Sequence, residues 1–124
     1  MCGISGIINY NLSQPVSKND LFLSTKNMAN RGPDYQSFWF SSDNLLGLGH
    51  TRLSIIDLSE NANQPMQDDC KNCIVFNGEI YNYKELKKSL IDLGYYFKTN
   101  SDTEVILKLY QEYGINFTKK LRGM

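Results

Sequence analysis

The sequence lacks long apolar runs and an excess of either charge. Its apolar stretches, such as residues 4–8 and 53–58, are short, well below the ~20 residues that a membrane-spanning helix needs. Thirteen basic residues balance thirteen acidic ones, so nothing indicates an electrostatic surface for nucleic acid or for an anionic membrane. We therefore expect neither a nucleic-acid partner nor a membrane partner.

Cysteine and histidine are also scarce. The three cysteines are an odd number, and no basic segment followed by an apolar one opens the chain, so we expect a cytoplasmic protein without a disulfide framework. Cys70 and Cys73 form a CxxC, but only Cys2 and His50 remain as further soft ligands, and a zinc site needs about four. We expect no metal site and interpret the pair as loop-to-strand residues. A reversible local disulfide remains the alternative.

At 124 residues the chain has the size of one domain. Segments rich in β-branched or aromatic residues predict strands at residues 3–10, 35–40, 45–57 (one long strand or two short ones) and 73–76. Capping residues before helical apolar spacing predict helices that begin at Ser17, Asn82 and Ser101. Because strands dominate early and helices late, the predicted class is α+β.

Cys2 is the residue with the clearest chemical potential. Removal of Met1 would leave a thiol and a free α-amine on one residue. An α-amine has a pKa of about 7.7–8.0, which suits a general base near neutral pH, and a thiol needs little help to become a nucleophile. The alternative is that Cys2 is only a small residue after the initiator methionine.

Asn77-Gly78 supports two interpretations. Asn-Gly between apolar segments is a strong signal for a short hairpin. An Asn side-chain amide and a Gly backbone N–H could instead form an oxyanion hole, since acyl transfer needs donors where negative charge develops. The short segment after Gly78 runs directly into the predicted helix, which weakens the hairpin interpretation.

Three further polar residues have both structural and functional interpretations. Arg52 lies in an apolar stretch and needs a carboxylate, either an internal one such as Asp57 or Asp34 or that of a ligand. Asp102 lies in the first turn of a predicted helix, where acidic residues are favoured, and could also bind an ammonium group. His50 is the only histidine, so any serine–histidine or cysteine–histidine dyad would have to use it, but in a predicted strand it is interpreted as structural.

Six motifs occur in order along the chain, and together they resemble the class II glutamine amidotransferase domain of glutamine-dependent asparagine synthetases. The resemblance extends from Met1 to Met124. The motifs are Met1-Cys-Gly-Ile-Ser-Gly6, Arg31-Gly-Pro-Asp34, His50-Thr-Arg-Leu-Ser-Ile-Ile-Asp57, Gln64-Pro-Met66, Asn77-Gly-Glu-Ile-Tyr-Asn82 and Ser101-Asp-Thr-Glu-Val-Ile106.

This resemblance implies an N-terminal-nucleophile hydrolase fold, a four-layer α/β/β/α sandwich of antiparallel sheets. It implies that Cys2 attacks the carboxamide of L-glutamine and that its own amine accepts the proton. Asn77 and Gly78 would hold the oxyanion, and Arg52 would pair with the α-carboxylate of glutamine. The remaining glutamine-binding residues that it implies are Leu53, Ser54, Ile55, Ile56, Glu79 and Asp102.

The family also sets expectations beyond this chain. Residues 1–124 would be the N-terminal portion of the glutaminase domain, truncated at its C-terminus, with no cofactor of its own. A C-terminal synthetase domain, which uses ATP and Mg, would convert aspartate to asparagine with the ammonia. Relatives that modify surface polysaccharide sugars share this N-terminus, so the acceptor stays open. A retained Met1 would block the site, and an inert binding module is the second alternative. We also consider a homodimer.

Overall fold

The computed structural model describes residues 1–124 and contains two compact units. The first unit comprises residues 1–54, 63–65 and 75–77, and the second comprises residues 55–62, 66–74 and 78–124. No helix has the length and apolar character needed to span a bilayer. The predicted α+β class is confirmed, and both sheets are antiparallel.

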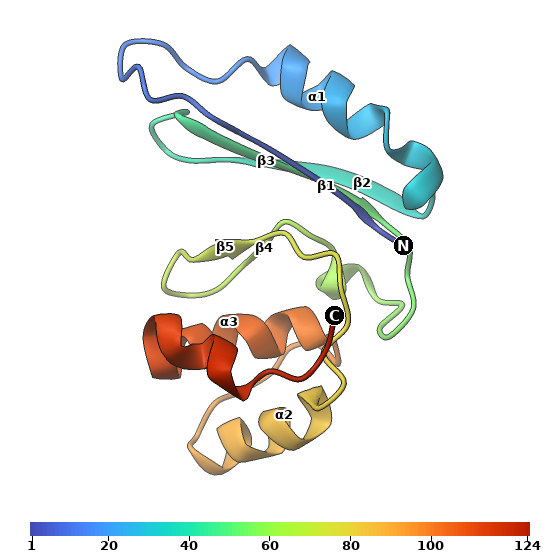
Figure 1. Cartoon of the computed structure of the whole chain (residues 1–124), viewed down its shortest axis with the longest axis vertical. Helices are drawn as coiled ribbons and strands as arrows, with labels where there is room; N and C mark the ends of the chain where they lie inside the picture. The colour runs from blue at the N-terminus through green and yellow to red at the C-terminus, as the bar shows by residue number, and fades with distance from the viewer. The chain divides into compact units, whose positions relative to one another are not determined.

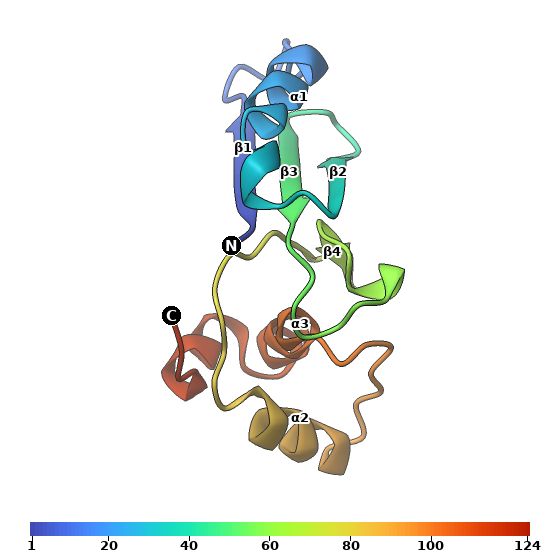
Figure 2. The ribbon, with the colours of Figure 1, turned by 90° about the vertical axis from the view of Figure 1, so that its right-hand side faces the viewer.

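A three-stranded antiparallel sheet forms the first unit. Its strands are β1 (Gly3–Ile8), β2 (Tyr35–Phe40) and β3 (Leu46–Arg52), and β3 lies between the other two (Figure 2). In register, Gly3 pairs with Thr51 and Tyr35 pairs with Arg52. This arrangement places the start of β1 beside the end of β3, next to Cys2.

Helix α1 (Lys18–Lys26) covers one face of this sheet (Figure 1). The predicted cap is confirmed, because the Ser17 hydroxyl accepts a hydrogen bond from the backbone N–H of Asp20. Leu21 and Thr25 are fully buried. A Cβ on Gly49 would collide with the Thr25 side chain, so the helix approaches β3 more closely than a larger residue would permit.

The predicted strand at residues 45–57 ends earlier, at Arg52. The prediction that this strand continues to residue 57 was wrong, because the next two backbone N–H groups do not pair with a neighbouring strand. Leu53 donates to Cys2 Sγ at 3.3 Å, and Ser54 donates to the Asp34 carboxylate at 2.7 Å. The first strand likewise ends at Ile8 rather than at Tyr10.

The second unit has a helical core and a short hairpin. Helices α2 (Tyr83–Asp92) and α3 (Asp102–Tyr113) pack through Leu90, Val105 and Leu109. The hairpin pairs β4 (Met66–Gln67) with β5 (Cys73–Ile74). Three short 3-10 helices complete the chain: η1 (Ala29–Arg31) in the first unit, and η2 (Glu60–Ala62) and η3 (Gly114–Lys120) in the second.

The structure does not support the hairpin interpretation of Asn77-Gly78. Strand β5 ends at Ile74 and pairs with β4 rather than with residues after Gly78. Ile80 forms an isolated antiparallel bridge with Gly123 instead. Asn77-Gly78 therefore belongs to an irregular connection that leads to α2, with a bend at Gly78.

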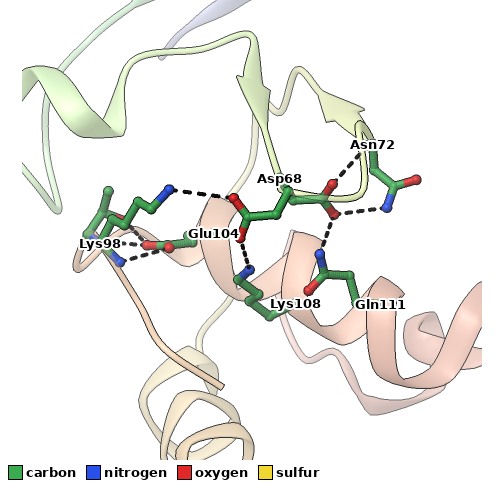
Figure 3. Close-up of polar contacts among 8 residues, drawn as sticks. Asp68, Asn72, Lys98, Glu104, Lys108 and Gln111 are labelled. Carbon is green, nitrogen blue, oxygen red and sulfur yellow. Dashed lines mark hydrogen bonds and ion pairs between the residues drawn. The ribbon is translucent and has the colours of Figure 1, made fainter. Parts of the chain in front are cut away.

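Carboxylates organise the loops of the second unit (Figure 3). Asp68 accepts hydrogen bonds from the backbone and side chain of Asn72 and from the side chain of Gln111, at 2.8–2.9 Å. The buried Glu104 accepts from the backbone N–H groups of Lys98 and Thr99 and from the Thr99 hydroxyl. These contacts attach the hairpin turn and the loop before α3 to one face of that helix.

Candidate active site

Cys2 lies directly before β1 and is half-buried. Its Sγ accepts a hydrogen bond from the backbone N–H of Leu53 at 3.3 Å and donates to the Leu53 carbonyl at 3.7 Å. The Arg31 guanidinium donates to the backbone carbonyl of Cys2 at 3.0 Å. The thiol is thus held against the chain that leaves β3, whereas Met1 is 66% exposed.

Arg52, the last residue of β3, is only 7% exposed. One of its terminal nitrogens donates to the side-chain oxygen of Asn63 at 2.7 Å. Of the two carboxylates considered for Arg52, Asp34 accepts from the backbone N–H of Ser54 and Asp57 accepts from the backbone N–H groups of Ser59 and Asn100. The partners of the Arg52 guanidinium thus include the neutral side-chain amide of Asn63.

The segment at Asn63-Gln64 was not given a role from the sequence, although Gln64 belongs to one of the recurring motifs. Gln64 is 7% exposed, and its side-chain oxygen accepts the backbone N–H of Phe76 at 2.5 Å. The Ser37 hydroxyl on β2 donates to the backbone carbonyl of Gln64. Asn77, which follows Phe76, is exposed. The Gln-Pro motif was the only available signal for these contacts.

In the second unit, Asp102 opens α3 and is 5% exposed. Its carboxylate accepts the backbone N–H of Ile80 at 3.0 Å. Burial raises the pKa of Asp102, the Ile80 hydrogen bond opposes this rise, and the charge of Glu79 adds to it. Glu79 and Gly78 are exposed. Asp102 is therefore linked to the short segment that carries two other predicted site residues.

The predicted binding residues after Arg52 fall in both units. Leu53 and Ser54 belong to the first unit, while Ile55, which is 72% exposed, and Ile56 belong to the second. In the second unit, the Asp57 carboxylate accepts the backbone N–H of Asn100 at 2.7 Å. This contact connects the loop after Ile56 to the loop that leads into α3.

His50 is completely buried on β3. Burial lowers its pKa from 6.5 to about 4; the nearby Phe76 backbone raises it in part, and the charge of Arg52 lowers it further. Neither ring nitrogen has a hydrogen-bond partner of normal geometry. A neutral, enclosed imidazole agrees with the structural role predicted for His50.

The CxxC residues lie where the sequence placed them. Cys70 is exposed in the turn after β4, and Cys73 begins β5. Burial raises the pKa of Cys73 to about 11, with a smaller contribution from Asp68. Both thiols are free, and a thiol of such high pKa is a poor nucleophile near neutral pH.

A pocket of about 230 Å³ lies within the second unit, but it contains none of the predicted site residues. Its charged groups contact one another: Asp69 lies 3.7 Å from Lys98 and 3.9 Å from Lys108. Glu104, on the same wall, already accepts three hydrogen bonds. These groups have partners in the absence of a ligand.

The order of the six motifs points to an amidotransferase domain. The glutamine amidotransferase domain family matches residues 1–124. The chain belongs to this family, as the resemblance of its motifs predicted.

Curated relatives give the same result. The chain is 46% identical to asparagine synthetase [glutamine-hydrolyzing] 2 of Bacillus subtilis, covering 100% of the chain and 16% of that protein. It is 43% identical to Amidase chry2 of Gibberella zeae, covering 99% of the chain and 20% of that protein. Asparagine synthetase B of Escherichia coli is 39% identical, with coverage of 100% and 22%. The chain spans about a fifth of the length of the curated relatives it matches.

Proposed function

We propose that this chain is the N-terminal portion of a class II glutamine amidotransferase domain, which hydrolyses L-glutamine to glutamate and ammonia. Membership of the family supports the reaction. The observation that carries the site assignment is the contact of the Cys2 thiol with the backbone of Leu53, the residue directly after the buried Arg52. This contact supports the assignment, because Leu53 directly follows the candidate carboxylate-binding residue Arg52 in the chain.

Cys2 acts as the nucleophile once Met1 has been removed. The sulfur attacks the carboxamide carbon of glutamine, and the freed α-amine of Cys2 accepts the thiol proton and passes it to the departing nitrogen. Ammonia leaves as the γ-glutamyl thioester forms. Water then attacks the thioester, which releases glutamate and restores the thiol. The high exposure of Met1 is compatible with its removal by an aminopeptidase.

The other predicted residues bind the substrate or stabilise developing charge. The Asn77 amide and the Gly78 backbone N–H donate to the oxyanion. Arg52 pairs with the α-carboxylate of glutamine, as the planar guanidinium favours. Asp102 and Glu79 bind its α-ammonium group. Backbone groups of four further residues contact the bound glutamine: Leu53, Ser54, Ile55 and Ile56.

The acceptor of the ammonia is a property of the whole protein. The Bacillus subtilis and Escherichia coli relatives favour aspartate, converted to asparagine by an ATP- and Mg-dependent synthetase domain in the cytoplasm. No residue of this chain is assigned a role toward ATP or Mg. The second candidate is a sugar acceptor, which the resemblance to relatives that modify surface polysaccharides also implies. Product analysis with aspartate and ATP separates the two.

We also propose that the first unit belongs to a four-layer sandwich of the N-terminal-nucleophile hydrolase type. Helix α1 covers one face of its sheet (Figure 1). On alternate positions of β1, Ile4 and Ile8 are 44% and 57% exposed, and such apolar side chains suit packing against a second sheet. A crystal structure of the full-length protein tests this; a sheet face left in contact with solvent there contradicts it.

The test of the function uses the full-length protein, including any sequence beyond residue 124. Mass spectrometry first establishes that Met1 is absent, and glutamate release from glutamine is then measured. We expect Cys2→Ala to abolish the activity and Asn77→Ala to lower its rate roughly 10²–10³-fold. Cys70→Ala is the matched control, because it removes an exposed thiol outside the site.

The alternative of an inert binding module makes the opposite prediction. It expects no glutamate release by the processed wild-type protein, or the same release by Cys2→Ala. Either result contradicts the proposed function. A loss of only a few-fold in Asn77→Ala removes the oxyanion assignment while leaving the nucleophile in place.

A further inference from the structure

Two adjacent residues of the first unit, Asn63 and Gln64, contact the chain at two predicted functional positions. Asn63 accepts a hydrogen bond from the Arg52 guanidinium at 2.7 Å. Gln64 accepts one from the backbone N–H of Phe76 at 2.5 Å, one residue before Asn77. The proposed reaction gives neither residue a chemical step.

The Asn63 contact fixes a cation without neutralising it. A guanidinium has five N–H donors in a rigid plane, so a bond of 2.7 Å from one of its nitrogens restricts its orientation. The amide oxygen of Asn63 carries no net charge. The Asn63 contact therefore does not itself offset the positive charge of Arg52, whereas an acidic residue at the same position would.

The Gln64 contact fixes the backbone that leads into Asn77. Gln64 is 7% exposed and its contact with the N–H of Phe76 is partly buried, and backbone N–H groups that are withdrawn from water generally have partners. Strand pairing ends at Ile74, so the N–H of Phe76 obtains its partner from this side chain instead of from a strand. Gln64 is itself attached to β2, through the hydrogen bond from the Ser37 hydroxyl to its backbone carbonyl.

We propose that Asn63 and Gln64 are positioning residues for glutamine hydrolysis, in which Asn63 orients Arg52 toward the α-carboxylate and Gln64 holds the backbone of Asn77 for oxyanion binding. The inference rests on the proposed function. Asn63 then acts mainly on substrate binding, whereas Gln64 acts on the rate of the chemical step. If both residues had only a general structural role, their substitutions would not affect KM and kcat separately in this way.

Asn63 is tested by substitution in the full-length, processed protein. Asn63→Ala raises KM for glutamine roughly tenfold with a smaller change in kcat, because a hydrogen bond to a charged group is lost. Asn63→Asp also raises KM, because its carboxylate competes with that of the substrate. With glutaminamide, in which the α-carboxylate is replaced by a neutral amide, Asn63→Ala has the same kcat/KM as the wild type. Equal KM values for glutamine in wild type and Asn63→Ala overturn the Asn63 assignment.

Gln64 is tested with two variants of similar shape. Gln64→Met lacks the acceptor and lowers kcat roughly tenfold, while Gln64→Glu keeps an acceptor oxygen and retains more of kcat. In an Asn77→Ala background, Gln64→Met has little additional effect, because both changes act on one group. Additive losses in this double-mutant cycle indicate a general structural role and overturn the Gln64 assignment.

A matched control and a fold measurement complete the experiment. Gln111→Ala removes a side-chain amide bond of 2.9 Å to Asp68 in the second unit and leaves both constants unchanged. Thermal unfolding and active-site titration of each variant correct the rates for misfolded protein. Loss of activity in Cys2→Ala, with unchanged kinetics in the Asn63 and Gln64 variants, contradicts this inference alone. Full activity in Cys2→Ala contradicts the proposed function instead.

Discussion

The two units of the chain achieve order by different means. In the first unit, close approach dominates: α1 lies against glycine positions of β3, and Gly32 adjoins the backbone of Thr51 and Arg52. In the second unit, carboxylates dominate, because Glu104 and Asp68 accept hydrogen bonds from loops that have no strand partners. Close packing therefore constrains the first unit most, whereas hydrogen bonds to carboxylates constrain the second.

This difference bears on how each unit presents its functional residues. Cys2 directly precedes β1 and Arg52 ends β3, so the register of these paired strands determines how the two residues lie relative to each other. Asp102 lies at a helix start whose preceding loop is held by Glu104. We therefore expect substitutions that add volume to damage the first unit, and substitutions that remove an acceptor to damage the second.

The largest effect is expected from added volume at Gly32. The Cβ of Gly32→Ala would overlap the backbone of Thr51 and Arg52, which cannot move without disturbing β3, and we expect a loss of about 3 kcal/mol in unfolding free energy. Gly94→Ala is the control: its φ is +95° but its Cβ would meet open space, so only strain of ~1–2 kcal/mol applies. Urea unfolding compares them, and equal losses would remove the distinction between the units.

The buried imidazole of the first unit gives a pH-dependent prediction. The pKa of His50 is about 4 in the folded protein against 6.5 ordinarily, so the unfolded chain binds a proton first as the pH falls. Stability is complete above pH 6.5 and declines toward pH 4, by at most ~3 kcal/mol from this residue. His50→Leu should flatten that decline. An unchanged pH profile of unfolding free energy in this variant contradicts the burial argument.

Loss of an acceptor should affect the second unit. Glu104→Gln keeps the shape of the side chain but turns one acceptor into a donor that faces the N–H groups of Lys98 and Thr99. We expect a loss of about 2 kcal/mol in urea unfolding. Glu112→Gln, at an exposed site where the carboxylate accepts from the Tyr95 hydroxyl, should change stability far less.

The smallest effect is expected from the surface ion pairs of Asp69. Its carboxylate side chain is 80% exposed and lies 3.7–3.9 Å from two lysines, and exposed pairs of this kind contribute ~0–1 kcal/mol. Asp69→Ala should therefore leave the unfolding midpoint nearly unchanged. A large loss would mean that charge pairing, in addition to backbone hydrogen bonding, stabilises the second unit.

Local signals predicted much of the fold. The strand at Tyr35–Phe40 and the helix starts after Ser17 and Ser101 are confirmed, because alternation and capping act within a few residues. The strand proposed through residue 57 was wrong, and the alternative interpretation of Asn77-Gly78 as a hairpin is not supported. In both cases the partners of the backbone N–H groups came from distant residues, such as Cys2 and Gln64.

The sequence by itself determined the family, the α+β class and the candidate nucleophile Cys2, because ordered motifs and local periodicity are properties of the chain. Only the tertiary structure showed that the Cys2 thiol meets Leu53 and that Asn63 and Gln64 contact the chain at Arg52 and next to Asn77. Such contacts depend on strand register and on which buried polar groups need partners. Strand register and hydrogen-bond partners could not be deduced from the sequence, because the residues that they bring together are far apart along the chain.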